Sequence, residues 1–278
     1  TASSGGDAGG TVVGNYCTLN PVDGRGSAAS APVNGNLEQT ITANGSDANG
    51  AGCAGTIAVT SGKWYWEFAQ TTATAATVVG VTQSDKSAAI NYTNSVLYLG
   101  SNGNKVIQGT STSYGATYGQ NDIIGIALDL DGGTITFYKN NSSQGTITLP
   151  SSSYGWKPHW GWGSATGSVS GVFNFGQRPF AYAAPSGFKS LNTANLPTPT
   201  ILAGNTAFDV KTYTGNGGTQ SISGLAFSPD LVWIKCRSNV EDHVWSDTIR
   251  GTNTFLFSDL TNAEVTSYSN VFNAFNSD

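Results

Sequence analysis

Charged side chains are scarce in this sequence. Asp, Glu, Lys and Arg make up 10% of its 278 residues, against about 25% in ordinary soluble domains. The basic residues form no cluster along the chain, which argues against nucleic-acid binding because that requires the neutralisation of many phosphates. Low-charge surfaces made of Gly, Ser, Thr, Asn and Gln are common in secreted, cell-surface and virion proteins.

Long apolar runs and methionine are also missing. No apolar stretch approaches the roughly 18 residues of a membrane-spanning helix, so we expect no membrane insertion. The first residues are small and polar and do not resemble a signal peptide. Because the chain contains no Met and begins at Thr1, we expect it to be a fragment or a processed product.

Cysteine and histidine are too few to predict a metal site. The three cysteines, Cys17, Cys53 and Cys236, have no CxxC spacing, and there are only two histidines, so a structural zinc site has little support. A disulfide between Cys17 and Cys53 is one interpretation. Three unpaired, partly buried thiols are the interpretation that we prefer.

The sequence does contain a long series of short β-strand patterns. Gly, Asn, Ser and Pro separate them, which is typical of a sandwich or barrel rather than of alternating helices and strands. No convincing amphipathic helix is present. The predicted strands of the larger part are Asn36–Ala43, Lys63–Gln70, Ala76–Thr82, Val96–Leu99, Lys105–Gln108, Asp122–Leu130, Thr134–Tyr138, Gly145–Leu149, Trp160–Trp162 and Val169–Phe175.

The clearest local prediction is a hairpin over Asp129–Lys139. Its centre is Asp131-Gly132-Gly133, and Asp-Gly and Gly-Gly supply the positive φ angles that tight hairpin turns require. The same residues match the start of a calcium loop, but the acidic ligands that should follow downstream are absent. We therefore predict a turn and no metal site.

The composition divides the chain into four parts. Residues 1–14 are rich in Gly, Ser and Ala and are predicted to be a flexible lead-in, and residues 15–188 hold the larger β domain. Residues 189–205 are predicted to be a Pro-containing linker. Residues 206–278 form a second β-rich module that we expect to be incomplete, because no closing strand follows. Its predicted strands are Phe208–Tyr213, Gln220–Ile222, Leu231–Lys235 and Thr254–Ser258, with a hairpin at Gly215–Gly218 and a short helical turn at Thr261–Glu264.

Several motifs occur in a fixed order in the larger domain. They are GKWYWEF at Gly62–Phe68, VVGVTQSD at Val78–Asp85, NDIIGIALDLDGGTITFYKNN at Asn121–Asn141, the stretch Pro158–Trp162, and VFNFG at Val172–Gly176. This order resembles the SPRY family, with Asn121 standing where that family usually has Gly. The resemblance implies an all-β fold, a concanavalin-like antiparallel β-sandwich that binds a partner, followed by the second, truncated β-rich domain.

The flanking segments resemble phage proteins. GNYCTLNPVD at Gly14–Asp23 and the stretch Phe175–Ile201 are similar to SPRY modules of bacteriophage structural proteins. Phe227–Arg237, Asp247–Gly251 and Phe272–Asp278 resemble a β-rich module that follows such domains in tail and appendage proteins. The resemblance implies a virion location and a host-contacting appendage, commonly trimeric. Its partners would be other virion proteins and a host-surface glycan or protein.

Two predicted loops have the composition of recognition loops. Ser84–Asn94 and Gly100–Gln120 combine Tyr with Ser, Thr, Gly and Asn, as adaptable binding loops do. Ordinary exposed loops or subunit contacts are the alternative. The residues that we predict to contact a ligand there are Tyr92, Asn102, Tyr114 and Tyr118.

An aromatic stretch after a Ser/Gly loop adds two candidates. Trp156 and His159 lie close to the loop and are predicted to contact the ligand, with a position in the core as the alternative. Trp160 and Trp162 alternate with glycines and are predicted to face the core.

Catalytic patterns are weak. Glu67 stands among Trp64, Tyr65 and Trp66, but glycan hydrolysis needs a second carboxylate across a cleft, so we interpret it as an exposed strand residue beside core aromatics. His243, Ser246 and Asp247 lie close in sequence, which does not make a triad. We predict no enzyme, no catalytic residue and no cofactor. Capsid decoration or a structural adaptor without its own receptor, and a glycan-degrading enzyme, remain as alternatives.

Overall fold

A computed structural model describes residues 14–25, 31–42, 52–72, 77–86, 92–162, 167–198, 201, 203–266 and 272–276. The chain divides into two compact units, Thr1–Leu196 (unit 1) and Pro197–Asp278 (unit 2). The predicted lead-in lies outside the described residues except for Gly14. In the described part of the chain, no helix has the length and apolar character needed to span a membrane.

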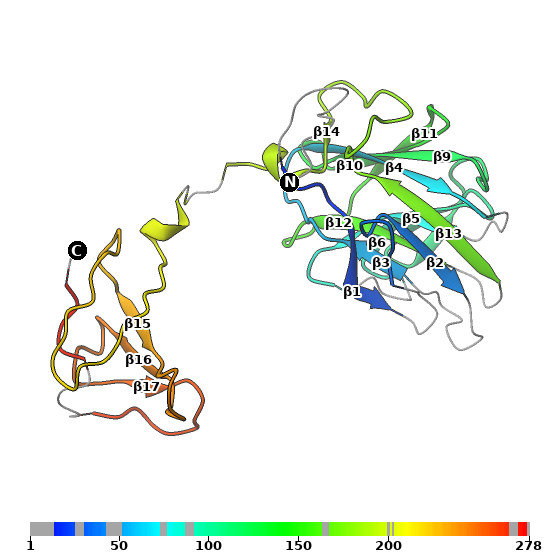
Figure 1. The fold of residues 1–278 in the computed structure, drawn as a ribbon. Helices are drawn as coiled ribbons and strands as arrows, with labels where there is room; N and C mark the ends of the chain where they lie inside the picture. Colours follow the sequence, from blue (N-terminus) through cyan, green and yellow to red (C-terminus); the bar gives the residue numbers. More distant parts are fainter. Residues whose placement is uncertain are drawn as a thin grey trace. The chain divides into compact units, whose positions relative to one another are not determined.

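Unit 1 is a sandwich of two β-sheets (Figure 1). We name the sheets after their central strands, β5 and β4. The β5 sheet has the order β1 (Leu19–Arg25), β3 (Gly52–Gly55), β12 (Trp156–Trp162), β5 (Thr77–Gln83), β6 (Ser95–Leu99), β7 (Lys105–Ile107) and β8 (Thr110–Thr112). The β4 sheet has the order β11 (Ser142–Thr148), β10 (Thr134–Lys139), β9 (Ile123–Asp129), β4 (Lys63–Gln70), β13 (Ser168–Asn174) and β2 (Glu38–Thr42). All these neighbours are antiparallel, so the predicted all-β sandwich is confirmed.

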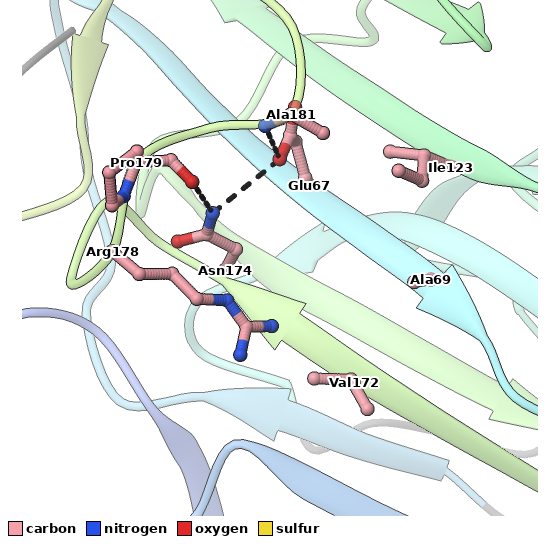
Figure 2. Close-up of a pocket in the computed structure, with 8 residues that line it drawn as sticks. All are labelled: Glu67, Ala69, Ile123, Val172, Asn174, Arg178, Pro179 and Ala181. Carbon is pink, nitrogen blue, oxygen red and sulfur yellow. Dashed lines mark hydrogen bonds between the residues drawn. The ribbon is translucent and has the colours of Figure 1, made fainter.

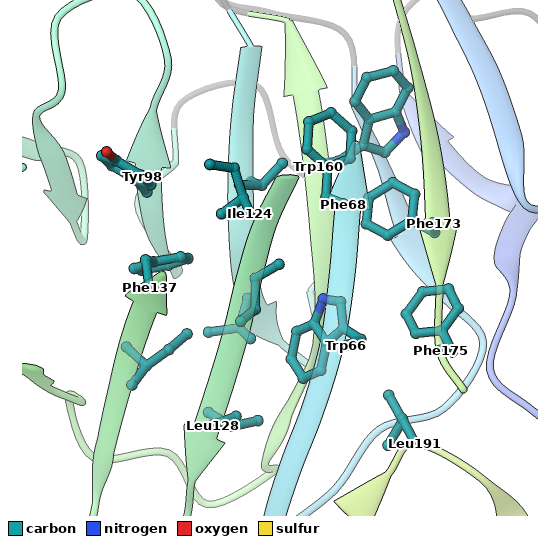
Figure 3. Close-up of a cluster of buried hydrophobic side chains, with 14 of the residues drawn as sticks. Trp66, Phe68, Tyr98, Ile124, Leu128, Phe137, Trp160, Phe173, Phe175 and Leu191 are labelled. Atoms are coloured by element: carbon teal, nitrogen blue, oxygen red, sulfur yellow. The ribbon is translucent and has the colours of Figure 1, made fainter. Parts of the chain in front are cut away.

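The core between the sheets is aromatic (Figure 3). Side chains alternate along β4, so Trp64, Trp66 and Phe68 point into the core while the residues between them face the opposite side of the sheet. Trp160 from the β5 sheet packs 5.6 Å from Phe68, measured between ring centroids. The core position predicted for Trp160 is confirmed, and the side chain of Trp162 lies outside the described residues.

The predicted linker begins too early. Lys189–Ser190 forms β14, which pairs in parallel with β4, and Leu191 is fully buried in the core. The backbone N–H of Cys17 donates to the carbonyl of Leu191 at 2.9 Å, which ties this segment to the start of the domain. Unit 1 therefore extends beyond Phe188, to Leu196.

Unit 2 contains one small sheet in its described residues. It is formed by β15 (Leu231–Ile234), β16 (Val244–Asp247) and β17 (Leu256–Phe257), all antiparallel. The strands predicted at Phe208–Tyr213 and Gln220–Ile222 are wrong: these residues are exposed and make no strand pairing. The hairpin at Gly215–Gly218 and the helical turn at Thr261–Glu264 are also wrong: the first segment has no strand pairing and the second has no helical turn.

All three cysteines are free thiols. Cys17 and Cys53 are fully buried, and this burial raises the pKa of Cys17 to about 11 and that of Cys53 to about 12. Cys236 is partly exposed, and hydrogen bonds from Ser238 lower the pKa of its thiol. The preferred prediction of three unpaired thiols is confirmed.

Candidate functional site

Most of the aromatic residues predicted to bind a ligand are inside the sandwich. Tyr118 is 2% exposed, and its hydroxyl lies 2.9 Å from the carbonyl oxygen of Tyr98 and 3.2 Å from that of Thr77. Burial raises the pKa of this phenol. Tyr118 therefore anchors its loop to β5 and β6, and its predicted exposure is wrong.

The other residues of the second predicted loop also serve the local structure. Residues 105–107 and 110–112 of this loop are the strands β7 and β8. The half-buried Tyr114 donates its hydroxyl proton to the carbonyl of Gly145 and packs edge-on against Tyr98, with ring centroids 5.5 Å apart. Asn102 is exposed, and its side-chain oxygen accepts from the backbone N–H of Asn104 at 3.0 Å. Of the three ligand contacts predicted in this loop, only Asn102 is exposed.

Trp156 and His159 are buried on opposite faces of the β5 sheet. Trp156 is 3% exposed and belongs to the main core. His159 is 2% exposed, and its Nδ1 lies 3.3 Å from Ser95 Oγ. Burial, helped by the charge of Lys157, lowers the pKa of His159 to about 3. His159 is thus a neutral interior residue, and the predicted ligand contacts at both positions are not supported.

Tyr92 covers His159. The two ring centroids are 6.2 Å apart, and the buried Tyr92 hydroxyl has no hydrogen-bond partner among the described residues. Desolvation raises the pKa of Tyr92 to about 12. Residues 87–91 of the predicted loop lie outside the described residues.

A different feature occupies the outer face of the β4 sheet. Residues 178–185, which we call the strap, run over this face after β13 (Figure 2). Glu67 Oε2 accepts from the backbone N–H of Ala181 at 2.8 Å, and Glu67 Oε1 accepts from that of Tyr182 at 2.9 Å. The Tyr65 hydroxyl and the Asn174 amide are further donors, at 3.3 and 3.5 Å. Glu67 therefore attaches the strap to the sheet.

The prediction that Glu67 is an exposed residue is wrong. Its side chain is 4% exposed, and burial of an ionised carboxylate is tolerated because several donors replace water. Nothing in the local sequence could show this, because the two strap amides that bind Glu67 are 114 and 115 residues away.

A pocket of about 220 Å³ opens between the strap and the sheet. Its lining residues are Glu67, Ala69, Ile123, Val172, Asn174, Arg178, Pro179 and Ala181. Arg178 is exposed, and Figure 2 shows its guanidinium over β13, between Asn174 and Val172. No described acidic residue forms an ion pair with it. We call this the Arg178 pocket.

A second pocket lies beside the other part of the strap. It has a volume of about 180 Å³ and is lined by Tyr65, Tyr138, Asn141, Ala183 and Pro185. Tyr65 packs edge-on against Phe180 of the strap, with ring centroids 4.9 Å apart. This face of the domain therefore carries two small hollows with different linings.

Two other cations of the β4 sheet, Lys63 and Lys139, are paired with carboxylates. Lys63 lies 2.8 Å from Asp129, and Lys139 lies 3.3 Å from Asp122. These contacts raise the pKa of Lys63, and hydrogen bonds from the lysines and nearby backbone lower the pKa of both aspartates despite their partial burial. Arg178 is distinct because its charge is unpaired beside a pocket.

The residues of the weak catalytic patterns are not assembled. His243 Nδ1 accepts the indole proton of Trp233 at 2.9 Å, while the hydroxyl of Ser246 lies 3.3 Å from the carbonyl oxygen of Gly251. Within the described ranges, no three His, Cys, Asp or Glu residues lie close enough together to hold a metal ion.

Comparison with known proteins identifies two regions. Residues 63–178 match the SPRY domain, and residues 204–278 match a domain of unknown function (DUF7483). No curated protein matches the chain. Among solved structures, the SPRY domain of human HERC1 is 20% identical, with a TM-score of 0.46 over 56% of this chain and 96% of that domain. Stonustoxin is also 20% identical, with a TM-score of 0.45 over 58% of this chain but 27% of the toxin chain. The chain thus carries a SPRY module over residues 63–178, as the order of its motifs predicted.

Proposed function

We propose that the chain is a non-enzymatic structural protein of a phage virion, a tail fibre or other appendage, whose SPRY module recognises a protein or the host surface. The observation that carries the recognition role is the Arg178 pocket: an open hollow beside an unpaired cation, on a sheet whose Lys63 and Lys139 are both paired. A surface of this kind offers a specific contact to a partner at small cost in rearrangement.

The state of Glu67 supports recognition rather than glycan cleavage. A glycosidase needs a carboxyl group that exchanges a proton with the substrate. Both oxygens of Glu67 accept hydrogen bonds from strap amides. A carboxylate engaged in this way is suited to hold a segment in place.

The virion location is supported by sequence. The segments Gly14–Asp23 and Phe175–Ile201 resemble those of phage structural proteins, and the chain has few charges. The virion partners and a homotrimeric state follow from the same resemblance.

Unit 2 supports assembly with other proteins. Trp233 is 56% exposed and Phe208 is 69% exposed, and Leu231 is exposed on the same strand as Trp233. Exposed apolar side chains gathered on one unit are typical of surfaces that other proteins cover. Neighbouring virion subunits would provide that cover.

Labelling of intact particles tests the location. Antibodies against unit 1, visualised with gold on purified particles, should mark the tail. Labels distributed with icosahedral symmetry on the head would instead identify the chain as a capsid decoration protein. Particles that contain no such chain by mass spectrometry would overturn the proposal.

Competition for adsorption tests recognition. An excess of the purified chain should slow the attachment of particles to host cells. Unchanged attachment, with the tail labelled, would favour a structural adaptor without its own receptor.

A further inference from the structure

We propose that the Arg178 pocket binds a peptide segment in which an acidic residue stands next to a short aliphatic one. This rests on the proposed role of the SPRY module in recognising a partner. Three features of the pocket lead to this ligand: its cation, its floor and its rigidity.

The first feature is the free guanidinium of Arg178. Arginine presents several N–H donors in one plane and binds carboxylates in a bidentate manner. Two carboxylates stand opposite β13 in the strand register: Glu67 is opposite Asn174, and Glu38 is opposite Val172 and accepts from Asn34 Nδ2 at 2.6 Å. Neither of them forms an ion pair with Arg178. An external carboxylate is therefore the missing partner of this cation.

The charge of Glu67 determines how the peptide is oriented in the pocket. Its carboxylate lies under the strap, where it is bound by the amides of Ala181 and Tyr182. An acidic ligand group would be repelled from that wall and attracted to the opposite one, where Figure 2 shows Arg178. The carboxylate of the ligand is thus placed at the Arg178 side.

The second feature is the aliphatic floor. Val172, Ala69 and Ile123 stand side by side in the register of β13, β4 and β9, and Pro179 adds an apolar wall. No aromatic ring lines this pocket, so the face of a sugar would find nothing on which to stack. This lining favours a peptide over a glycan.

The size of the pocket limits the ligand further. Its volume of about 220 Å³ is below the roughly 300–1,000 Å³ of sites for drug-sized molecules. It suits one short aliphatic side chain with the neighbouring backbone, while the acidic group reaches Arg178 at the rim.

The third feature is the rigidity of the segment that carries Arg178. Asn174 Nδ2 donates to the carbonyl of Pro179 at 3.1 Å, and Asn174 Oδ1 accepts from the backbone N–H of Gly176 at 3.0 Å. The chain is thus held by hydrogen bonds on both sides of Arg178 in sequence. Ligand binding would therefore immobilise little beyond the Arg178 side chain.

Two capped peptides, Ac-Gly-Asp-Val-Gly-NH2 and the Asn-containing analogue, test the proposal in an NMR titration of the full chain. The Asp peptide should shift the backbone amides of Ala69, Val172 and Arg178, with affinity at least about tenfold higher than the Asn peptide, which corresponds to about 1.4 kcal/mol. Equal affinities, or no shifts at these residues, would overturn the proposal.

Variants of the full chain locate the contact. Arg178→Gln should abolish the preference for Asp, and Ala69→Leu should fill the pocket without changing its charge. Lys189→Gln is the matched control, because Lys189 is another exposed cation without an ion-pair partner in the described part of unit 1. A preference for Asp that survives Arg178→Gln would refute the assignment, whatever the effect of Ala69→Leu on folding.

Two further ligands test whether the pocket binds any carboxylate or selects one that belongs to a peptide. Sodium acetate should bind more weakly than the Asp peptide, and glucuronic acid should not shift the pocket amides. Binding of either as strongly as the peptide would overturn the peptide assignment. Peptide binding by a chain that is absent from particles would refute only the proposed virion role, whereas a labelled tail without peptide binding would refute only this inference.

Discussion

Glu67 accepts a hydrogen bond from the backbone N–H of Ala181, 114 residues further along the chain, at 2.8 Å. This contact joins the middle of a central strand to a segment that follows the last long strand of the sandwich. It builds one wall of the Arg178 pocket, because both residues line it. The pocket therefore depends on a buried charge that is stabilised by backbone donors.

Replacement of Glu67 by Gln should loosen the strap. The amide NH2 of Gln would face a strap N–H where a carboxylate oxygen now accepts, which leaves a buried donor unsatisfied and costs about 1–3 kcal/mol. We expect faster hydrogen exchange at the amides of Ala181 and Tyr182 and a lower free energy of unfolding in urea. Glu38→Gln, on the edge strand β2, is the control and should change stability by less than about 0.5 kcal/mol. Unchanged exchange at both amides would show that Glu67 does not hold the strap.

Much of the fold could be predicted from the sequence, because alternating patterns carry it. Lys63–Gln70 was predicted with the bounds that β4 has, and the hairpin at Asp129–Lys139 joins β9 and β10. Strand β3 was missed because Gly52–Gly55 contains only Gly, Ala and Cys, which have no strand signal. It forms because β1 and β12 pair with it from both sides.

The site was harder to predict than the fold. Tyr among Ser, Gly and Asn is typical of recognition loops, but Tyr118 has the same neighbours and is buried, with its hydroxyl bonded to strand carbonyls. Local composition cannot distinguish a tyrosine that closes a core from one that faces a ligand. The Arg178 pocket was missed because its parts come from β4, β9, β13 and the strap, which no short motif connects.

Close packing against Gly171 gives a second prediction. A Cβ atom at this position would lie 2.2 Å from Phe68 Cε2 and 3.2 Å from Trp160 Cζ3. Because these rings are fixed in the core, we expect Gly171→Ala to lower the free energy of unfolding by about 1–3 kcal/mol. Gly119→Ala is the matched control, since no atom lies within 4 Å of its added Cβ. Equal stabilities of the two variants in urea denaturation would contradict the packing described.

The thiols give a third prediction. The thiolate is the reactive form of cysteine, and burial raises the pKa of both Cys17 and Cys53. Cys236 is partly exposed, with a lowered pKa. In the native chain at pH 8, a thiol-specific colour reagent should therefore modify one cysteine rapidly and the other two only after denaturation. Cys236→Ser should remove the fast phase, and a fast phase that persists in this variant would be the contrary result.

The buried imidazole of His159 makes stability dependent on pH. Its pKa is lowered from 6.5 to about 3 in the folded chain, first by burial and then by the charge of Lys157. Between these values the unfolded chain binds a proton that the folded chain does not, so stability falls as pH falls from about 6.5 towards 3, by up to about 1.4 kcal/mol per pH unit. The lowered pKa values of Asp122 and Asp129 add a loss with the same sign at lower pH. His159→Gln isolates the histidine contribution, because both chains share the aspartates. The free energy of unfolding of the native chain should fall more steeply than that of His159→Gln between pH 6.5 and 4.5, and parallel curves would show that folding does not lower the pKa of His159.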